Sequence, residues 1–269
     1  MSLSNSHLKQ KQLRKDLIAQ RFLKAEQTYT QHALIQKNMS EHLCQLMLKL
    51  CPPQLPKVLE IGCGSGNLTG QVVENFSIDH LYLNDLYEQV KQFFLVKNTQ
   101  STQYPPIVWC IGDIEKQALE NNFSAIISSS ALQWMSHLQL LLQRLYTACM
   151  NHGYLCFSTF GPENLFEIKA LTGQGLHYWS LDDWQRELTQ CGFNILTLTE
   201  EKQYLYFNTA KDVLKHLKAT GVTATTATDQ RWTRQNLHQF YADYEQFKQQ
   251  DGRYCLTYHP IYCIARKEI

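Results

Sequence analysis

The stretch that decides the fold is Val58-Leu59-Glu60-Ile61-Gly62-Cys63-Gly64-Ser65-Gly66. Its first four residues are apolar apart from Glu60, which predicts a short buried strand. The glycines that follow predict a tight turn, and because glycine has no Cβ, the backbone of this turn can approach a ligand closely. A strand followed by a glycine-rich turn and a helix is typical of α/β folds that bind nucleotide-like ligands.

Strands and helices alternate along the chain after this stretch. Short apolar segments predict the strands, and segments with apolar residues three and four positions apart predict the helices. Because the strands are apolar almost throughout, we expect a parallel sheet with helices on both faces, which is an α/β fold. The expected strands are 57–61, 80–83, 107–111, 124–128 and 154–159, and the expected helices are 68–74, 87–97, 138–150 and 181–190.

The residues around the glycine loop distinguish between two kinds of ligand. A dinucleotide-binding loop would have its third glycine where Asn67 stands. The carboxylate of Glu60 would repel a pyrophosphate, but it suits an ammonium group, directly or through water. The loop therefore favours S-adenosylmethionine, and Cys63 is expected to be a small spacer in it rather than a nucleophile.

Polar residues stand at the ends of the second, third and fourth strands of the predicted sheet, and those at the fourth are Ser128 and Ser129. Asp85 ends the second strand, where a carboxylate can accept hydrogen bonds from both ribose hydroxyls. Asp113 ends the third, where it can bind the adenine amino group while Ile114 packs on the ring. Either aspartate alone would more often be a helix cap or a turn residue, but their order along consecutive strand ends favours a cofactor site. The residues predicted to bind the cofactor are Glu60, Gly62, Cys63, Gly64, Gly66, Asp85, Leu86, Asp113, Ile114, Ser128 and Ser129.

Composition and charge limit the alternatives. The net charge of +1 disfavours nucleic acid as a partner. The nine cysteines are scattered without a C-x-x-C pair, which predicts reduced thiols and no metal site. The sequence shows neither a secretory signal nor an apolar run long enough for a membrane span, so we expect a cytoplasmic protein.

Positive charge is concentrated in the first expected helix. A solvated helix face is the simpler interpretation of this concentration, and a landing site for an acidic partner is the alternative. The basic residues are Lys9, Lys11, Arg14, Lys15, Arg21 and Lys24.

Segments across almost the whole chain resemble the malonyl-acyl-carrier-protein O-methyltransferases of biotin synthesis, a family within the class I S-adenosylmethionine-dependent methyltransferases. The sequence departs from the family at Cys255, where members often have proline, and at Tyr87, where a small or polar residue is usual. The segments that carry the resemblance are Phe22–Ala25, Tyr29–Ala33 with Gln36, Ala131–Trp134, Phe157–Gly161, Leu217–Ala224 and Gly252–Tyr258.

The resemblance implies methyl transfer from S-adenosylmethionine to the free carboxylate of a malonyl thioester, either malonyl-acyl carrier protein or malonyl-CoA. The methyl ester then primes the pimeloyl chain of biotin, and S-adenosylhomocysteine is the second product. A carboxylate is already ionised at neutral pH, so no general base is required. The candidates for holding this carboxylate or shaping its pocket are Tyr29, His32, Gln133, Trp134, Lys218 and Arg253.

Several of these candidates have a purely structural alternative. Tyr29 and His32 are three residues apart on an expected helix and could pack against the sheet. Lys218 could be a cation favoured by the C-terminal end of its helix, and Arg253 could order the hairpin before the last strand. Two other functions also remain open, namely methylation of a different small carboxylic acid and an inactive methyltransferase fold that binds a partner.

The ends of the chain do not follow the central alternation of strands and helices. Three prolines at 52, 53 and 56 separate a helical N-terminal part from the main fold. The segments after residue 192 predict strands at 193–199, 204–207 and 256–265 and helices at 210–218 and 235–247. We therefore expect an N-terminal helical segment over the active site (1–50), an S-adenosylmethionine-binding core (51–208), a helical lid (209–250) and a final strand (251–269). The resemblance implies that the core is a seven-stranded, mostly parallel, Rossmann-like methyltransferase sheet.

Overall fold

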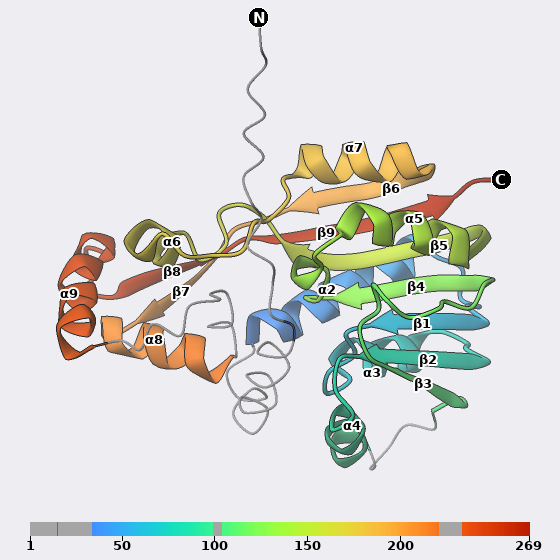
Figure 1. Cartoon of the computed structure of the whole chain (residues 1–269), viewed down its shortest axis with the longest axis horizontal. Coiled ribbons are helices and arrows are strands. Elements are labelled where there is room, and N and C mark those ends of the chain that lie inside the picture. The colour runs from blue at the N-terminus through green and yellow to red at the C-terminus, as the bar shows by residue number, and fades with distance from the viewer. Residues whose placement is uncertain (1–14, 16–33, 99–103, 221–232) are drawn as a thin grey trace, which may run out of the picture.

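The structure, a computed structural model shown in Figure 1, describes Lys15 and residues 34–98, 104–220 and 233–269. A seven-stranded sheet lies at its centre, in the strand order β3-β2-β1-β4-β5-β9-β6. The first five strands of this order are parallel, and β9 runs antiparallel between β5 and β6. The strands are β1 (Lys57–Ile61), β2 (His80–Asp85), β3 (Ile107–Ile111), β4 (Phe123–Ser129), β5 (Cys149–Phe160), β6 (Phe193–Glu200) and β9 (Pro260–Lys267). The predicted seven-stranded, mostly parallel α/β sheet is confirmed.

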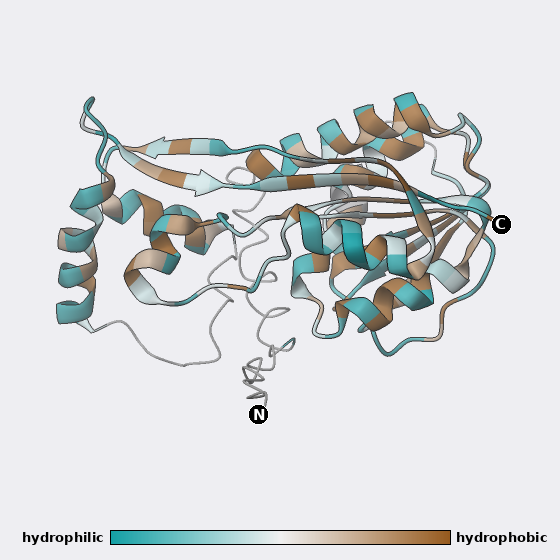
Figure 2. Ribbon diagram, turned by 90° about the horizontal axis from the view of Figure 1, so that it is seen from above, coloured by the Kyte–Doolittle hydropathy of each residue, from teal (hydrophilic) through white to brown (hydrophobic). Residues whose placement is uncertain are grey.

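Helices cover both faces of this sheet, and the two faces form separate hydrophobic cores. Adjacent residues of β1 point to opposite faces, so that Val58 belongs to one core and Leu59 to the other. The first core is covered by α2 (Leu34–Leu50), α3 (Asn67–Asn75) and α4 (Val90–Asn98), and the second by α5 (Leu138–Ala148) and α7 (Leu181–Cys191). Figure 2 shows the hydrophobic residues concentrated along the paired strands and on the helix sides that face them.

The strand order determines where a ligand can bind. β1 pairs with β2 on one side and with β4 on the other, so Ile61 at its carboxyl end is level with both Asn84 and Ser128. The connections that leave β1 and β4 therefore diverge to opposite sides of the sheet. In open α/β sheets the crevice at such a point is the usual ligand site.

A smaller two-stranded sheet extends beyond the main one (Figure 1). It consists of the antiparallel strands β7 (Gln203–Phe207) and β8 (Tyr254–Tyr258). The elements packed around it are α6 (Phe166–Thr172), α8 (Ala210–Ala219), α9 (Arg234–Tyr244) and the 3-10 turn η3 (Glu245–Phe247). None of the described helices combines the length and the apolar composition that crossing a bilayer requires.

The segment 256–265, predicted as one final strand, is divided between two sheets, so that prediction was wrong. β8 pairs with β7 up to Tyr258, and β9 pairs with β5 from Pro260 onward, with His259 between them. Proline lacks the N–H group that a strand interior needs and is tolerated at the first position of a strand. Every residue from Tyr254 to Ile264 is buried, so the sequence carries no alternation of polar and apolar residues that would reveal the change of partner.

A buried carboxylate fastens α6 to the small sheet. Glu167 is 3% exposed, and its two oxygens accept hydrogen bonds from the backbone N–H (3.0 Å) and the hydroxyl (2.6 Å) of Thr257 in β8. Both bonds join positions 90 residues apart in sequence. A buried polar group without a hydrogen-bond partner destabilises the folded state by the full free energy of its desolvation.

We expect Glu167→Ala to lower the free energy of unfolding by about 2–4 kcal/mol, because it leaves the buried N–H and hydroxyl of Thr257 without their acceptor. Urea unfolding followed by circular dichroism measures this change. Glu163→Ala is the matched control, since Glu163 lies four residues earlier, is exposed and pairs with the exposed Lys202. The control should change stability by less than about 0.5 kcal/mol, and equal losses in the two variants would contradict the assignment.

Candidate functional site

A cavity lies at the carboxyl ends of β1 to β4, at the point where the strand order reverses. The loops that follow these four strands form its walls, and most of the predicted cofactor-binding residues face it. Those predicted residues are Gly62, Gly64, Asp85, Leu86, Asp113, Ile114 and Ser129. The other lining residues are Lys15, Ile61, Ser65, Asn84, Tyr87, Gly112, Ser130, Ala131, Trp134 and Met135.

The glycine loop is held close to the loop that follows β4. Gly62 has a φ of +72°, and a Cβ on it would lie 2.4 Å from the Cβ of Ala131. Gly64 has a φ of +50°, but a Cβ there would meet no atom within 4 Å. The N–H groups of Gly62 and Cys63 both donate to the carbonyl oxygen of Asn84, which fixes the loop against the end of β2. The close packing against Ala131 therefore excludes a side chain at position 62. The space around Gly64 is open to the cavity.

The Asp85 carboxylate lies beside the glycine loop, as its position at the end of β2 predicts. Its Oδ2 accepts a hydrogen bond from Gly64 N–H (2.9 Å), and its Oδ1 accepts one from Leu86 N–H (2.7 Å). Burial raises the pKa of Asp85 to about 6, although the two backbone hydrogen bonds act in the opposite direction. The carboxyl group is thus largely ionised at neutral pH and loses its charge in mildly acidic solution.

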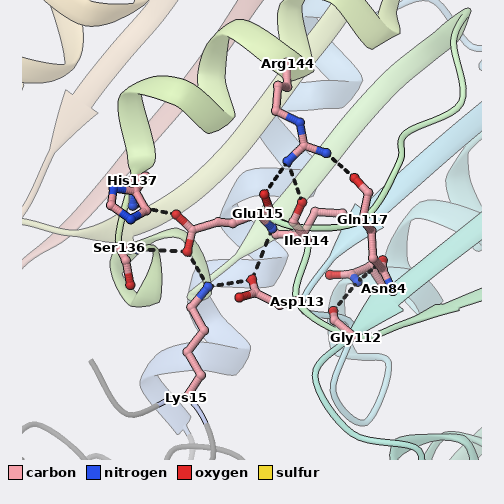
Figure 3. Close-up of polar contacts among 10 residues, drawn as sticks. All are labelled: Lys15, Asn84, Gly112, Asp113, Ile114, Glu115, Gln117, Ser136, His137 and Arg144. Atoms are coloured by element: carbon pink, nitrogen blue, oxygen red, sulfur yellow. Dashed lines mark hydrogen bonds and ion pairs between the residues drawn. The ribbon is translucent and has the colours of Figure 1, made fainter. Parts of the chain in front are cut away.

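The loop after β3 is held by a polar network, which Figure 3 shows. Arg144 of α5 donates to the carbonyl oxygens of Ile114 (2.9 Å), Glu115 (2.8 Å) and Gln117. The Glu115 carboxylate accepts from the N–H groups of Ser136 (3.0 Å) and His137 (2.5 Å). The backbone of this loop is therefore bonded to α5, and its Glu115 side chain is bonded to the segment that precedes α5.

The Lys15 ammonium group completes this network. It contacts Asp113 Oδ1 at 2.5 Å and also pairs with Glu115. Burial alone would raise the pKa of Glu115, but the hydrogen bonds from Lys15, Ser136 and His137 outweigh burial and lower it. The two neighbouring carboxylates thus share one cation at the edge of the cavity.

Glu60 does not face the cavity, although the sequence suggested that it could meet the ligand's ammonium group. Its side chain is buried behind the glycine loop, where Thr69 of α3 donates to Oε2 at 2.6 Å. Burial raises the pKa of Glu60 to about 8, the bond from Thr69 lowers it, and the charge of Asp85 raises it further. Glu60 therefore joins β1 to α3 beneath the loop.

Three other predicted cofactor residues also lie outside the lining of the cavity. The Ser128 hydroxyl donates to the carbonyl oxygen of Ile61 at 3.0 Å and ties β4 to β1. Cys63 is buried within the loop, which agrees with the predicted spacer role, and Gly66 precedes α3 with a φ of +83°. These residues shape the loop from behind.

The structure separates the residues predicted to hold the acceptor. Tyr29 and His32 lie outside the described residues. Trp134 lines the cavity, whereas Gln133 lines a second cavity that shares Met135 with the first. The Gln133 amide donates to the carbonyl oxygen of Ser130 at 2.7 Å and accepts from the Thr159 hydroxyl at 3.2 Å.

Lys218 and Arg253 line neither of these two cavities. Lys218 is exposed in the last turn of α8, a position that the helix dipole favours for a cation. The Arg253 guanidinium binds the Asp251 carboxylate (2.6 and 2.7 Å) and lies 4.8 Å from the ring centre of Tyr206. Arg253 therefore orders the turn into β8, which is the structural alternative that the sequence offered.

Among the cavity residues that were not predicted as ligand-binding, Asn84 and Lys15 make polar contacts that hold its walls. Asn84 is 3% exposed, and its amide donates to the carbonyl oxygens of Cys110 (2.7 Å) and Gly112 (3.0 Å), which ties β2 to the end of β3. Its sequence signal is a polar residue within an apolar strand, immediately before Asp85. Lys15 was predicted only as one of several basic residues on a helix face. Its partners are 98 and 100 residues away, so no local pattern reveals them.

Comparisons with known proteins agree with this geometry. The family model for a methyltransferase domain matches residues 35–198. A malonyl-acyl-carrier-protein O-methyltransferase from Acinetobacter baylyi is 52% identical over 256 residues, which cover 95% of this chain and 98% of that protein.

Solved structures show the same fold at low sequence identity. A provisionally assigned methyltransferase from Bacillus halodurans has a TM-score of 0.62 at 17% identity, over 84% of this chain and 99% of its own. The N-methyltransferase NodS from Bradyrhizobium japonicum, solved with S-adenosyl-L-homocysteine, has a TM-score of 0.52 at 12% identity, over 84% of this chain and 86% of its own.

The two glycines at 62 and 64 should respond differently to alanine. Gly62→Ala adds a clash with Ala131 to the cost of a positive φ, and we expect a loss of about 2–4 kcal/mol in the free energy of unfolding. Gly64→Ala, the control, adds backbone strain alone, at about 1 kcal/mol. Equal losses measured by urea unfolding would contradict the close contact between the two loops.

Proposed function

This chain belongs to the malonyl-acyl-carrier-protein O-methyltransferases, and on that basis we propose that it methylates the free carboxylate of malonyl-acyl carrier protein. The methyl donor is S-adenosylmethionine, and the products are the malonyl methyl ester and S-adenosylhomocysteine. The observation that carries the proposal is the extent of the similarity, since the relative's 52% identity spans 95% of this chain. It therefore extends well beyond the general methyltransferase domain at 35–198.

The residues of the cavity fit this methyl donor. Asp85 offers a carboxylate for the ribose hydroxyls, and Asp113 offers one for the adenine amino group. Leu86 and Ile114 provide apolar side chains for the flat purine, and Gly64 leaves room for the backbone to approach the amino-acid part. The structural neighbour NodS was solved with S-adenosyl-L-homocysteine, which supports the same use of this fold here.

The chemistry demands little of the protein beyond positioning. When bound, S-adenosylmethionine supplies an electrophilic methyl group on a positively charged sulfur. The acceptor carboxylate is ionised at neutral pH, so no side chain has to remove a proton. The task of the protein is to hold the acceptor oxygen in line with that methyl group and to keep water away.

The loop after β4 provides the wall on the acceptor side. The Ser129 hydroxyl bonds to those of Ser40 (3.1 Å) and Ser158 (2.9 Å), so this strand end is fixed to α2 and to β5. Trp134 is 7% exposed and places an indole ring in the cavity wall, where it excludes water. Gln133 shapes the neighbouring cavity, and we keep Tyr29 and His32 as candidates for holding the malonyl carboxylate.

The reaction places the protein early in a biosynthetic sequence. Esterification removes the charge from the malonyl carboxylate, and enzymes that extend fatty acyl chains can then treat the product as an apolar primer. The end of this sequence is the pimeloyl chain of biotin, made in the cytoplasm. Because Lys15 pairs with Asp113 and Glu115, we assign it to the cavity and not to a docking surface for the acidic carrier protein.

A direct assay tests the proposal. The protein is incubated with S-adenosylmethionine labelled in its methyl group and with malonyl-acyl carrier protein, malonyl-CoA or free malonate. We expect base-labile label on the malonyl thioesters. Transfer only to free acids would instead identify a small-molecule carboxyl methyltransferase, and binding of the cofactor without transfer to any acceptor would identify an inactive methyltransferase fold.

The affinity for S-adenosylhomocysteine should depend on pH through Asp85. Because the pKa of this carboxyl group is about 6, only about a tenth of it is ionised at pH 5. We expect the Kd measured by calorimetry to rise about tenfold between pH 7.5 and pH 5.

Asp85→Asn is the control, since the amide removes the titrating group. This variant should bind weakly at both pH values with a flat profile. Protonation of Asp85 should not unfold the protein at pH 5. Because the pKa of Asp85 is raised, the folded state binds this proton more tightly than the unfolded state does, so protonation favours the folded state. A wild-type Kd that stays constant down to pH 5 would contradict the role given to Asp85.

A further inference from the structure

We infer that Lys15 is a positioning residue for the methyl donor, because it holds the Asp113 carboxylate in the orientation that accepts the adenine amino group. This inference rests on the proposed function, since it assumes that the cavity binds an adenosyl ligand. Lys15 itself comes from the N-terminal part of the chain, far in sequence from the strands that form the cavity.

The first observation is the geometry of the ion pairs. The side chain of Lys15 is 16% exposed, and its Nζ lies 2.5 Å from Asp113 Oδ1 and in contact with Glu115 Oε2. Figure 3 shows the lysine side chain extending to a point between the two carboxylates. Lys15 is also one of the residues that line the cavity. Its ammonium group is therefore placed at the wall of the ligand site.

The second observation is how the oxygens of Asp113 are used. Oδ1 accepts both from Lys15 and from the N–H of Glu115, the latter at 3.1 Å. Within the described parts of the chain, no residue donates to Oδ2. Asp113 therefore has one oxygen fixed by the protein and a second that can accept a hydrogen bond from a ligand.

The third observation is that the second partner of Lys15, the Glu115 carboxylate, is itself held in place by hydrogen bonds. The Glu115 side chain is 8% exposed, and it is held by the N–H groups of Ser136 and His137. Lys15 thus connects an immobilised carboxylate to the carboxylate that faces the ligand. Without the ammonium group, the like charges of Asp113 and Glu115 would repel each other, and Asp113 would turn away from this orientation.

The consequence concerns which purine the site accepts. An ionised carboxylate that presents Oδ2 can accept a hydrogen bond from a 6-amino group, but it repels a 6-oxo group. Lys15 fixes the direction of the Asp113 carboxylate through its contact with Oδ1. Lys15 should therefore favour adenine over hypoxanthine in the bound ligand.

Lys15→Met tests this inference, because methionine keeps an apolar side chain of similar length and removes the charge. We expect the Kd for S-adenosylhomocysteine to rise five- to tenfold. The Kd for S-inosylhomocysteine should stay level or fall, because its 6-oxo group is repelled by the Asp113 carboxylate in the orientation that Lys15 fixes. Lys15→Arg should retain most of the preference for the adenosyl ligand. Lys57→Met is the matched control, since Lys57 pairs with Glu120 outside the cavity, and it should alter neither Kd.

A double variant separates positioning from a general effect on the fold. In the Asp113→Asn background, Lys15→Met should change the Kd for S-adenosylhomocysteine less than twofold, because there is no longer a carboxylate to orient. Equal losses for the two ligands, an equal loss in the Asp113→Asn background, or no loss at all would each overturn the inference while leaving the proposed function intact. A wild-type protein that binds neither ligand would overturn both.

Discussion

The site depends on one close approach between two loops. The glycine loop after β1 and the loop after β4 touch at Gly62 and Ala131, where a Cβ on the glycine would lie 2.4 Å from its neighbour. This approach is possible because β1 pairs with β2 on one side and β4 on the other, so their ends are level. The cavity lies beside this contact, and both Gly62 and Ala131 line it.

Four carboxyl groups lie at or near this edge of the sheet, and the protein treats each differently. Glu60 is buried beside Thr69, and its raised pKa favours the neutral form. The Asp85 carboxylate accepts hydrogen bonds from two backbone N–H groups, which partly offset the cost of burying its charge. Asp113 and Glu115 share the ammonium group of Lys15. The Asp85 carboxylate lines the cavity and is held by backbone N–H groups rather than by a cation, so its negative charge suits a ligand with positive charge.

Local pattern was sufficient to predict the parallel strands from β1 to β5 and where they end, because buried strands and amphipathic helices alternate over short stretches of sequence. Asp85 and Asp113 were predicted to lie at these strand ends for this reason, and both line the cavity. Local pattern did not reveal that the segment 256–265 is divided between two sheets. The side-chain directions were not predictable in the same way. The Glu60 side chain is buried behind the glycine loop, where it binds Thr69. Arg253 binds Asp251, two residues before it, and Lys15 binds carboxylates that are 98 and 100 residues away. These outcomes are set by tertiary packing, which a single sequence does not display.

The division of the last strand has a mechanical consequence. Because β8 leads into β9 through His259 alone, the small sheet is a direct prolongation of the large one rather than a body on a flexible tether. The junction is stiffened where His259 bonds to Glu200 (2.9 Å) and accepts from Gly161 N–H (2.7 Å). Displacement of α8 and α9 relative to the cavity must therefore twist a pair of hydrogen-bonded strands.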